Sequence, residues 1–287
     1  MNVYSEIADI RAYRWALRDI IWGLVPTMGA LHRGHLSLIR RAKQENEKVA
    51  VSIFVNPIQF NNPNDLRSYP RDLGRDLTLL EDEEVDLVWT PSPDIMYPPD
   101  FQTYIDVEEV TRSLEGASRP GHFRGVTTVV AKLFNVFQPD RAYFGEKDAQ
   151  QLVTIRRMVK DLGFNIEIIS GPTIREEDGL AVSSRNDNLS PKGRKQAVCL
   201  FQSLSQAKKA IEAGVRECKK LKALMTNIIM QYDSCKIDYI SFNHPDTLSE
   251  INRIQDRVLI SLAILIENVR LIDNMTIEVG AEGKLSK

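Results

Sequence analysis

The chain has 287 residues, of which 43% are hydrophobic and 26% are charged, and its formal net charge is −2. This composition is typical of a globular protein, and the length allows for about two domains. The small net charge gives no electrostatic reason to expect a nucleic-acid partner. The sequence contains no apolar run of about 18 residues and shows no signal-peptide pattern, so we expect no membrane association.

The three cysteines, Cys199, Cys218 and Cys235, all lie in the last third of the chain. Their spacing matches no metal-binding motif, and an odd number does not suggest a disulfide framework. We therefore expect reduced thiols in a cytoplasmic protein.

Helical and strand patterns alternate through the first part of the chain. We expect helices over 1–19, 36–48, 73–84, 127–137 and 149–162, strands over 20–25, 49–55, 85–90, 103–107, 141–144 and 165–169, and loops over 58–70 and 115–126. This alternation predicts an α/β fold with a Rossmann-like parallel sheet and right-handed crossovers.

The pattern changes after Gly171-Pro172. A polar loop over 174–188 leads to predicted helices over 191–212 and 216–232 and to strands over 237–242, 258–266 and 269–272. Helices followed by antiparallel strands indicate a smaller α+β domain. We place the boundary near Thr173, which gives domains 1–173 and 174–287.

The turn over 26–35 reads Pro-Thr-Met-Gly-Ala-Leu-His-Arg-Gly-His and joins a predicted strand to a helix. Gly29 and Gly34 let the backbone approach a bulky ligand, and the helix N-terminus suits an anion. His32 and His35 can donate hydrogen bonds to phosphate. The alternative is a glycine turn with two surface histidines. Neither Gly-x-Gly-x-x-Gly nor a P-loop motif occurs, which argues against the usual dinucleotide and P-loop sites.

Two further polar clusters follow a strand and a domain boundary. Lys147 in the turn 145–148 can reach a phosphate, and Asp148 can bind a ribose or simply cap the next helix. The loop 183–186, Ser-Ser-Arg-Asn, can clamp a polyphosphate or be an ordinary capped turn. Gln59 and Gln151 are neutral hydrogen-bonding groups that suit a substrate with hydroxyls and a carboxylate.

Several motifs in a fixed order carry a family resemblance. They are residues 26–35, Phe54-Val55-Asn56-Pro57-Ile58-Gln59-Phe60, Tyr69-Pro70-Arg71, residues 119–126 from Arg-Pro-Gly-His onward, Phe144-Gly145-Glu146-Lys147-Asp148-Ala149-Gln150-Gln151, Ser183-Ser184-Arg185-Asn186 and Arg270-Leu271-Ile272-Asp273-Asn274. With them the chain, from about residue 20 onward, resembles the pantoate–β-alanine ligase (pantothenate synthetase) family of the His-x-Gly-His nucleotidyltransferases.

The resemblance implies a two-step ligase. Pantoate attacks the α-phosphate of ATP with Mg2+ present, pyrophosphate leaves, and β-alanine then attacks the pantoyl adenylate to give pantothenate and AMP. Such a reaction needs positioning and charge stabilisation more than covalent help. The resemblance also implies a homodimer, and a smaller domain that closes over the ATP site and keeps water from the adenylate.

The resemblance assigns residues to roles. The implied ATP site comprises Met28, Gly29, Ala30, Leu31, His32, Arg33, Gly34, His35, Gly145, Glu146, Lys147, Asp148, Ile174, Val182, Ser183, Ser184 and Arg185. Among these, His32, His35 and Lys147 are the implied catalytic residues. Pantoate is assigned to Gln59, Gln151 and Asn56, and β-alanine to Gln59. Asp76 is the candidate metal ligand, with ATP itself as the alternative holder of the metal.

Two alternatives stay open. An adenylyl or cytidylyl transferase that releases a nucleotide-linked product would share the His-x-Gly-His turn, but the paired Gln59 and Gln151 argue against it. A non-catalytic nucleotide-binding or scaffold protein is disfavoured by the full set of catalytic-type residues.

Overall fold

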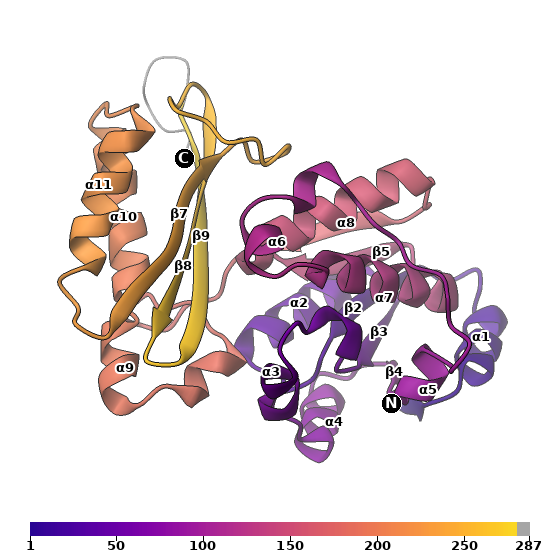
Figure 1. Ribbon diagram of the computed structural model, residues 1–287. Coiled ribbons are helices and arrows are strands. Elements are labelled where there is room, and N and C mark those ends of the chain that lie inside the picture. The colour runs from indigo at the N-terminus through magenta and orange to yellow at the C-terminus, as the bar shows by residue number, and fades with distance from the viewer. Residues whose placement is uncertain (280–287) are drawn as a thin grey trace. The chain divides into compact units, whose positions relative to one another are not determined.

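A six-stranded parallel sheet forms the first part of the computed structural model, which describes residues 1–279 (Figure 1). The strands lie in the order β1-β4-β3-β2-β5-β6. Their bounds are β1 (Asn2–Tyr4), β2 (Trp22–Thr27), β3 (Lys48–Ile53), β4 (Leu87–Trp89), β5 (Arg141–Gly145) and β6 (Glu167–Gly171). The predicted α/β class and parallel sheet are confirmed.

The strand order reverses beside β2. The chain runs from β2 through β3 and β4 to one side of the sheet, whereas β5 and β6 add to the other side. In a parallel sheet the loops that leave two such neighbouring strands diverge, and ligands bind in the crevice at their carboxyl ends. The turns after β2 and β5 therefore begin at the same edge, as the sequence predicts.

Helices cover both faces of this sheet. They are α1 (Ile7–Ala16), α2 (Arg33–Glu45), α3 (Pro63–Ser68), α4 (Leu73–Asp82), α5 (Pro93–Met96), α6 (Glu115–Ser118), α7 (His122–Phe137) and α8 (Ala149–Leu162), with 3-10 turns η1 (Pro57–Gln59), η2 (Glu109–Thr111) and η3 (Glu146–Asp148). Val88 packs in a core with Ile39 of α2 and Leu80 of α4. The next residue, Trp89, has its ring 5.7 Å from that of Phe137 on α7. Because successive strand residues point to opposite faces, α2 and α4 lie on one face and α7 on the other.

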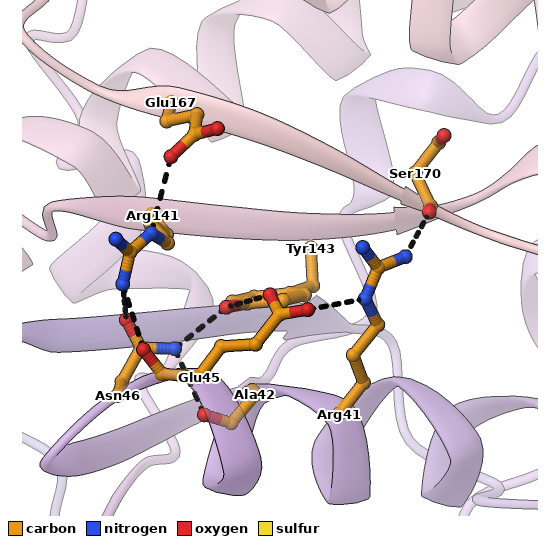
Figure 2. A network of polar contacts seen from close by, with 8 residues as sticks. All are labelled: Arg41, Ala42, Glu45, Asn46, Arg141, Tyr143, Glu167 and Ser170. Atoms are coloured by element: carbon orange, nitrogen blue, oxygen red, sulfur yellow. Dashed lines mark hydrogen bonds and ion pairs between the residues drawn. The ribbon is translucent and has the colours of Figure 1, made fainter.

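A polar network fixes the C-terminal end of α2 to the sheet (Figure 2). Asn46 donates to the Tyr143 hydroxyl at 2.6 Å, and that hydroxyl donates to Glu45 at 2.9 Å. Arg41 bonds both Glu45, at 2.8 Å, and the carbonyl of Ser170, at 2.6 Å. Burial raises the pKa of Tyr143 to about 12. The helix that begins at the His-x-Gly-His turn is thus tied to β5 and β6.

The second compact unit consists of Lys147–Val153 and the chain from Thr173 onward. Its helices and strands are η4 (Ser184–Asn188), α9 (Pro191–Gln196), α10 (Cys199–Glu212), α11 (Cys218–Ile229), β7 (Cys235–Asn243), β8 (Arg257–Ile266) and β9 (Val269–Glu278). The three strands form an antiparallel sheet in the order β7-β8-β9. Leu204 of α10 and Met225 of α11 pack with Ile260 and Leu262 of β8 in one core. This small α+β unit agrees with the predicted class.

Several predicted elements differ from the structure. The expected loop over 58–70 contains α3, the expected loop over 115–126 contains α6 and the start of α7, the expected helix over 191–212 is divided into α9 and α10, and the expected strand over 269–272 extends to Glu278. The first helix begins only at Ile7, because residues 2–4 pair with β4 as the edge strand of the sheet. No strand forms over 103–107; there the Ile105 amide donates to the Thr128 hydroxyl at 3.0 Å, and the Thr127 hydroxyl donates to the Ile105 carbonyl at 2.6 Å. Side chains of α7 thus satisfy backbone groups that a neighbouring strand would otherwise bond.

Cys199, Cys218 and Cys235 are free thiols. Within the described part of the chain, none of the helices has both the length and the apolar character needed to cross a bilayer.

Candidate functional site

The turn after β2 has an unusual backbone. Gly29 has φ = 79° and Ala30 has φ = 49°. A Cβ on Gly29 would lie 2.8 Å from Oδ2 of Asp76, so only glycine fits there without a shift. Ala30 is left-handed although it has a side chain, which is uncommon and requires support from neighbouring groups.

Asp76 of α4 supplies this support. Its Oδ2 accepts the amide of Ala30 at 2.9 Å, and its Oδ1 accepts the amide of Leu31 at 2.8 Å. The residue is only 1% exposed. On the other side, Thr27 accepts the Gly29 amide at 3.2 Å and donates to the Ser52 carbonyl at 2.8 Å. The two bonds to the Asp76 carboxylate are charge-assisted and therefore stronger than the neutral Thr27 bonds, and together these bonds hold the turn in its conformation.

His32 and His35 meet at the first turn of α2. The Nδ1 of His32 accepts the Gly34 amide at 3.2 Å, and the Nδ1 of His35 accepts the His32 amide at 3.3 Å. Their rings stack with centroids 4.0 Å apart. Because each Nδ1 is an acceptor, the proton of each neutral ring is at Nε2. The structure therefore brings together two Nε2–H donors at a helix N-terminus, which is favourable for an anion.

Gln59 and Asn56 lie close to this turn. Asn56 Nδ2 donates to Gln59 Oε1 at 2.9 Å, and Gln59 Nε2 contacts the Met28 sulfur at 3.1 Å. Asn56 is 1% and Gln59 is 7% exposed. His122 Nδ1 donates to the Gln59 carbonyl at 2.8 Å. The sequence shows His122 only as part of a motif, and its role in holding Gln59 is not visible there.

A cavity of about 370 Å3 opens beside Met28 and Gly29. Its other lining residues are Ile53, Phe54, Val55, Pro57, Leu66, Arg71, Asp72, Leu73, Asp76, Thr90, Pro91 and Pro93. The volume is within the usual range for small-molecule sites, and the lining is mostly apolar with a few charged groups. The cavity thus lies at the carboxyl ends of β3 and β4.

In the second unit, Lys147, Ser183 and Arg185 line one small cleft of about 10 Å3. The loop that carries the last two is closed by a bond from the Val182 amide to the Ile174 carbonyl at 2.9 Å. Ser183 caps η4 by accepting the Arg185 amide at 3.3 Å. Two cationic side chains and a hydroxyl in one cleft can bind phosphate oxygens.

An ion pair holds this loop against β9. Arg175 donates to both oxygens of Asp273, at 2.7 and 2.9 Å, and Asp273 is 2% exposed. Asn274 donates to the Lys147 carbonyl at 2.7 Å. The motif over 270–274 therefore contributes two residues that position the cleft, although the resemblance assigns none of its residues to a substrate.

The profile of the Pantoate-beta-alanine ligase family matches residues 2–276. The chain belongs to this family. It is 50% identical to the pantothenate synthetase of Acetivibrio thermocellus, with 97% of this chain and 100% of the relative covered. It is 52% identical to that of Roseiflexus castenholzii, with the same shares covered, 97% and 100%.

Solved structures of members of the same family are similar to this chain. The crystal structure of the Thermus thermophilus pantothenate synthetase has a TM-score of 0.92 and 46% identity, covering 96% of this chain and 99% of that one. The Francisella tularensis pantoate–β-alanine ligase has a TM-score of 0.80 and 39% identity, covering 96% and 97%. That protein was crystallised with β,γ-ATP and β-alanine. The predicted family and fold are confirmed.

The other residues expected in this ligase family's sites occupy varied positions. Leu31 is fully buried, and its amide is already bonded to Asp76. Arg33, Glu146 and Asp148 are exposed, and Val182 is buried. Gly34, Gly145, Gln151, Ile174 and Ser184 are half-buried. Their ligand-binding roles stay predictions.

Proposed function

We propose that this chain is an ATP-dependent ligase that condenses (R)-pantoate with β-alanine, giving pantothenate, AMP and pyrophosphate through a pantoyl adenylate. The family membership supports the reaction. The observation that carries it within the molecule is the pairing of His32 and His35 at the start of α2, in the same turn whose Met28 contacts the amide of Gln59. The Francisella tularensis relative, whose structure holds an ATP analogue and β-alanine, supports these two substrates.

In the first step, a pantoate carboxylate oxygen attacks the α-phosphorus of ATP. The bond from that phosphorus to the bridging oxygen breaks, and pyrophosphate leaves. His32 and His35 donate their Nε2–H groups to phosphate oxygens that gain charge in the transition state. The family resemblance assigns Lys147, Ser183 and Arg185 to the same phosphates, and closure of the second domain is part of this proposal.

In the second step, the β-alanine amine attacks the acyl carbon of the adenylate. The bond from that carbon to the phosphate oxygen breaks, AMP leaves, and the new amide nitrogen loses a proton. Gln59 and Gln151 hold the pantoyl group, Gln59 also faces β-alanine, and Asn56 lies behind it. Holding the amine near the anhydride makes this step effectively unimolecular.

The proposed reaction includes Mg2+, bound to ATP. Across residues 1–279, no group of three or more His, Cys, Asp or Glu side chains is arranged to hold a metal ion. The carboxylate of Asp76, the candidate ligand, is 1% exposed and already accepts two backbone amides. These residues do not form a metal site made by the protein alone. Mg2+ would therefore be bound chiefly by the triphosphate, and Asp76 as a ligand stays a prediction.

The experiment is ATP-dependent pyrophosphate release, with and without pantoate, followed by addition of β-alanine. We expect release to require pantoate, and AMP and pantothenate to form once β-alanine is present. A stable nucleotide-linked product without amine would instead identify a nucleotidyltransferase. No pantoate-dependent release from folded protein with Mg2+ would overturn the proposal.

The family resemblance also suggests a cytoplasmic homodimer, which is a further part of the proposal. Light scattering of the purified chain would test it, since a monomeric mass at micromolar concentration would contradict the dimer.

A further inference from the structure

We propose that Tyr97 is a positioning residue that, acting through Asn56, fixes which end of the Gln59 amide faces the substrate. This inference rests on the proposed function, because it concerns how the pantoate site discriminates. Tyr97 follows α5, and its hydroxyl donates to Asn56 Oδ1 at 2.8 Å. Asn56 in turn donates to Gln59 Oε1 at 2.9 Å. The three side chains form one directional chain of hydrogen bonds.

The direction of this chain is set by the carbonyl of Gly125 on α7. That carbonyl can only accept, and it receives Asn56 Nδ2 at 3.0 Å. The Asn56 amide group therefore cannot be reversed, since its oxygen would then face another acceptor. Its oxygen must face Tyr97, which donates, and its second N–H must face an acceptor on Gln59. Gln59 consequently keeps Oε1 toward Asn56 and turns its Nε2 away.

The backbone around Gln59 is equally constrained. A Cβ on Gly125 would lie 2.7 Å from the Gln59 Cα and nitrogen, so glycine allows α7 to approach η1 this closely. His122 Nδ1 donates to the Gln59 carbonyl at 2.8 Å. With the main chain and Oε1 both held, the planar amide group keeps the Gln59 Nε2–H groups pointing away from Asn56.

Tyr97 itself is well placed to act as a donor. Its ring packs against Phe101, at 5.0 Å between centroids, and against Phe54, at 6.1 Å. The Lys132 ammonium lies 5.9 Å from the ring centre. Burial raises the pKa of Tyr97, so the hydroxyl keeps its proton. The hydroxyl can therefore act as the donor in the bond to Asn56.

The fixed amide orientation means that Gln59 presents hydrogen-bond donors, and not its oxygen, to the substrate. Gln59 Nε2 donates to the Met28 thioether, a weak acceptor that a ligand oxygen would displace. Gln59 thus presents donors and selects oxygen acceptors such as a carboxylate or a hydroxyl lone pair. The primary amide of pantoate has one acceptor oxygen where the carboxylate has two, so it should bind more weakly, because its NH2 group cannot accept a hydrogen bond from Gln59.

The test compares Tyr97→Phe with Tyr104→Phe, a matched loss of a hydroxyl from a half-exposed tyrosine on the same segment. We expect Tyr97→Phe to raise the KM for pantoate about tenfold, as for loss of one buried hydrogen-bond partner, with the KM for ATP unchanged. Tyr104→Phe should leave both unchanged. Equal pantoate KM values in Tyr97→Phe and wild type would overturn the proposed role of Tyr97. A rise in the KM for ATP that matches the rise in the KM for pantoate would do the same.

A second measurement does not depend on the folding of a variant. In the wild-type enzyme, the inhibition constant of the primary amide of pantoate should be at least about tenfold higher than the KM for pantoate. Gln59→Glu should reduce or reverse this preference for the acid over the amide. Equal competition by acid and amide in the wild type would overturn the inference while leaving the ligase activity intact. Absence of pantoate-dependent turnover in the wild type would instead overturn the proposed function, and with it the proposed role of Tyr97.

Discussion

Asp76 Oδ1 lies 2.8 Å from the backbone nitrogen of Leu31, a residue 45 positions earlier in the chain. The same carboxylate reaches the amide of Ala30. One buried side chain of α4 therefore holds the strained turn that leads into His32 and His35. The conformation of the His-x-Gly-His turn depends on a residue outside the motif.

Asp76→Asn should weaken this support. An asparagine keeps one acceptor but places an NH2 group against a backbone N–H, and an unsatisfied buried donor costs about 1–3 kcal/mol. We expect a lower melting temperature and a rise of about tenfold or more in the KM for ATP. Asp82→Asn, an exposed position on the same helix, is the matched control. An unchanged KM for ATP in Asp76→Asn would show that the turn holds its shape without the carboxylate.

His35→Ala and Lys147→Ala should each slow adenylate formation by about a hundredfold or more, the usual effect of removing one donor to a developing anion. The measurement is single-turnover pyrophosphate release with ATP and pantoate. Lys219→Ala, at an exposed lysine of α11, controls for the general loss of a positive charge. Release near the wild-type rate from either site variant would remove that residue from the catalytic set.

Gly125→Ala should destabilise the first unit. The new methyl group would meet the Gln59 backbone at 2.7 Å, and backbone cannot move aside as a flexible side chain can. Overpacking of this kind typically costs about 1–3 kcal/mol, which lowers the denaturation midpoint. The control is Gly74→Ala on α4, where the nearest atom is 3.8 Å away. Alanine there should be neutral or stabilising, by up to about 1 kcal/mol. Equal midpoints for the two variants would contradict the close packing of α7 on η1.

The Glu45 network predicts a pH-dependent contribution to stability. The hydrogen bond from Arg41 lowers the pKa of Glu45 below its ordinary value of 4.5. A depressed carboxyl pKa stabilises the folded state above the unfolded value, and this contribution disappears as the pH falls through the folded pKa. Glu45→Gln should therefore lower the melting temperature at pH 7, and this deficit should shrink as the pH falls below the ordinary carboxyl value of 4.5 and through the lowered folded-state pKa. The exposed Glu81→Gln should change neither. A Glu45→Gln deficit that persists undiminished at low pH would exclude the ionised carboxylate as its source.

Much of the architecture could be predicted from local pattern. The helix over 149–162 and the buried strand before the His-x-Gly-His turn follow from apolar periodicity and β-branched runs. The segment 103–107 has a strand-like composition, yet its Ile105 backbone bonds to threonines of α7. The pattern of residues 2–4 predicts helix, yet they form the sheet's edge strand. In both places a contact distant in sequence overrode the local preference.

The sequence by itself determined the fold class, the family and the chemical types gathered at the strand-to-helix turns, because periodicity and motif order are written in neighbouring residues. Only the tertiary structure decided what supports those turns. Asp76 is a metal candidate by sequence, and its carboxylate accepts two turn amides. Tyr97 carries no signal in the sequence, and it directs the amide of Asn56. The physical reason is that a hydrogen bond needs its two partners within about 3 Å, and which distant side chain reaches that distance is settled by packing.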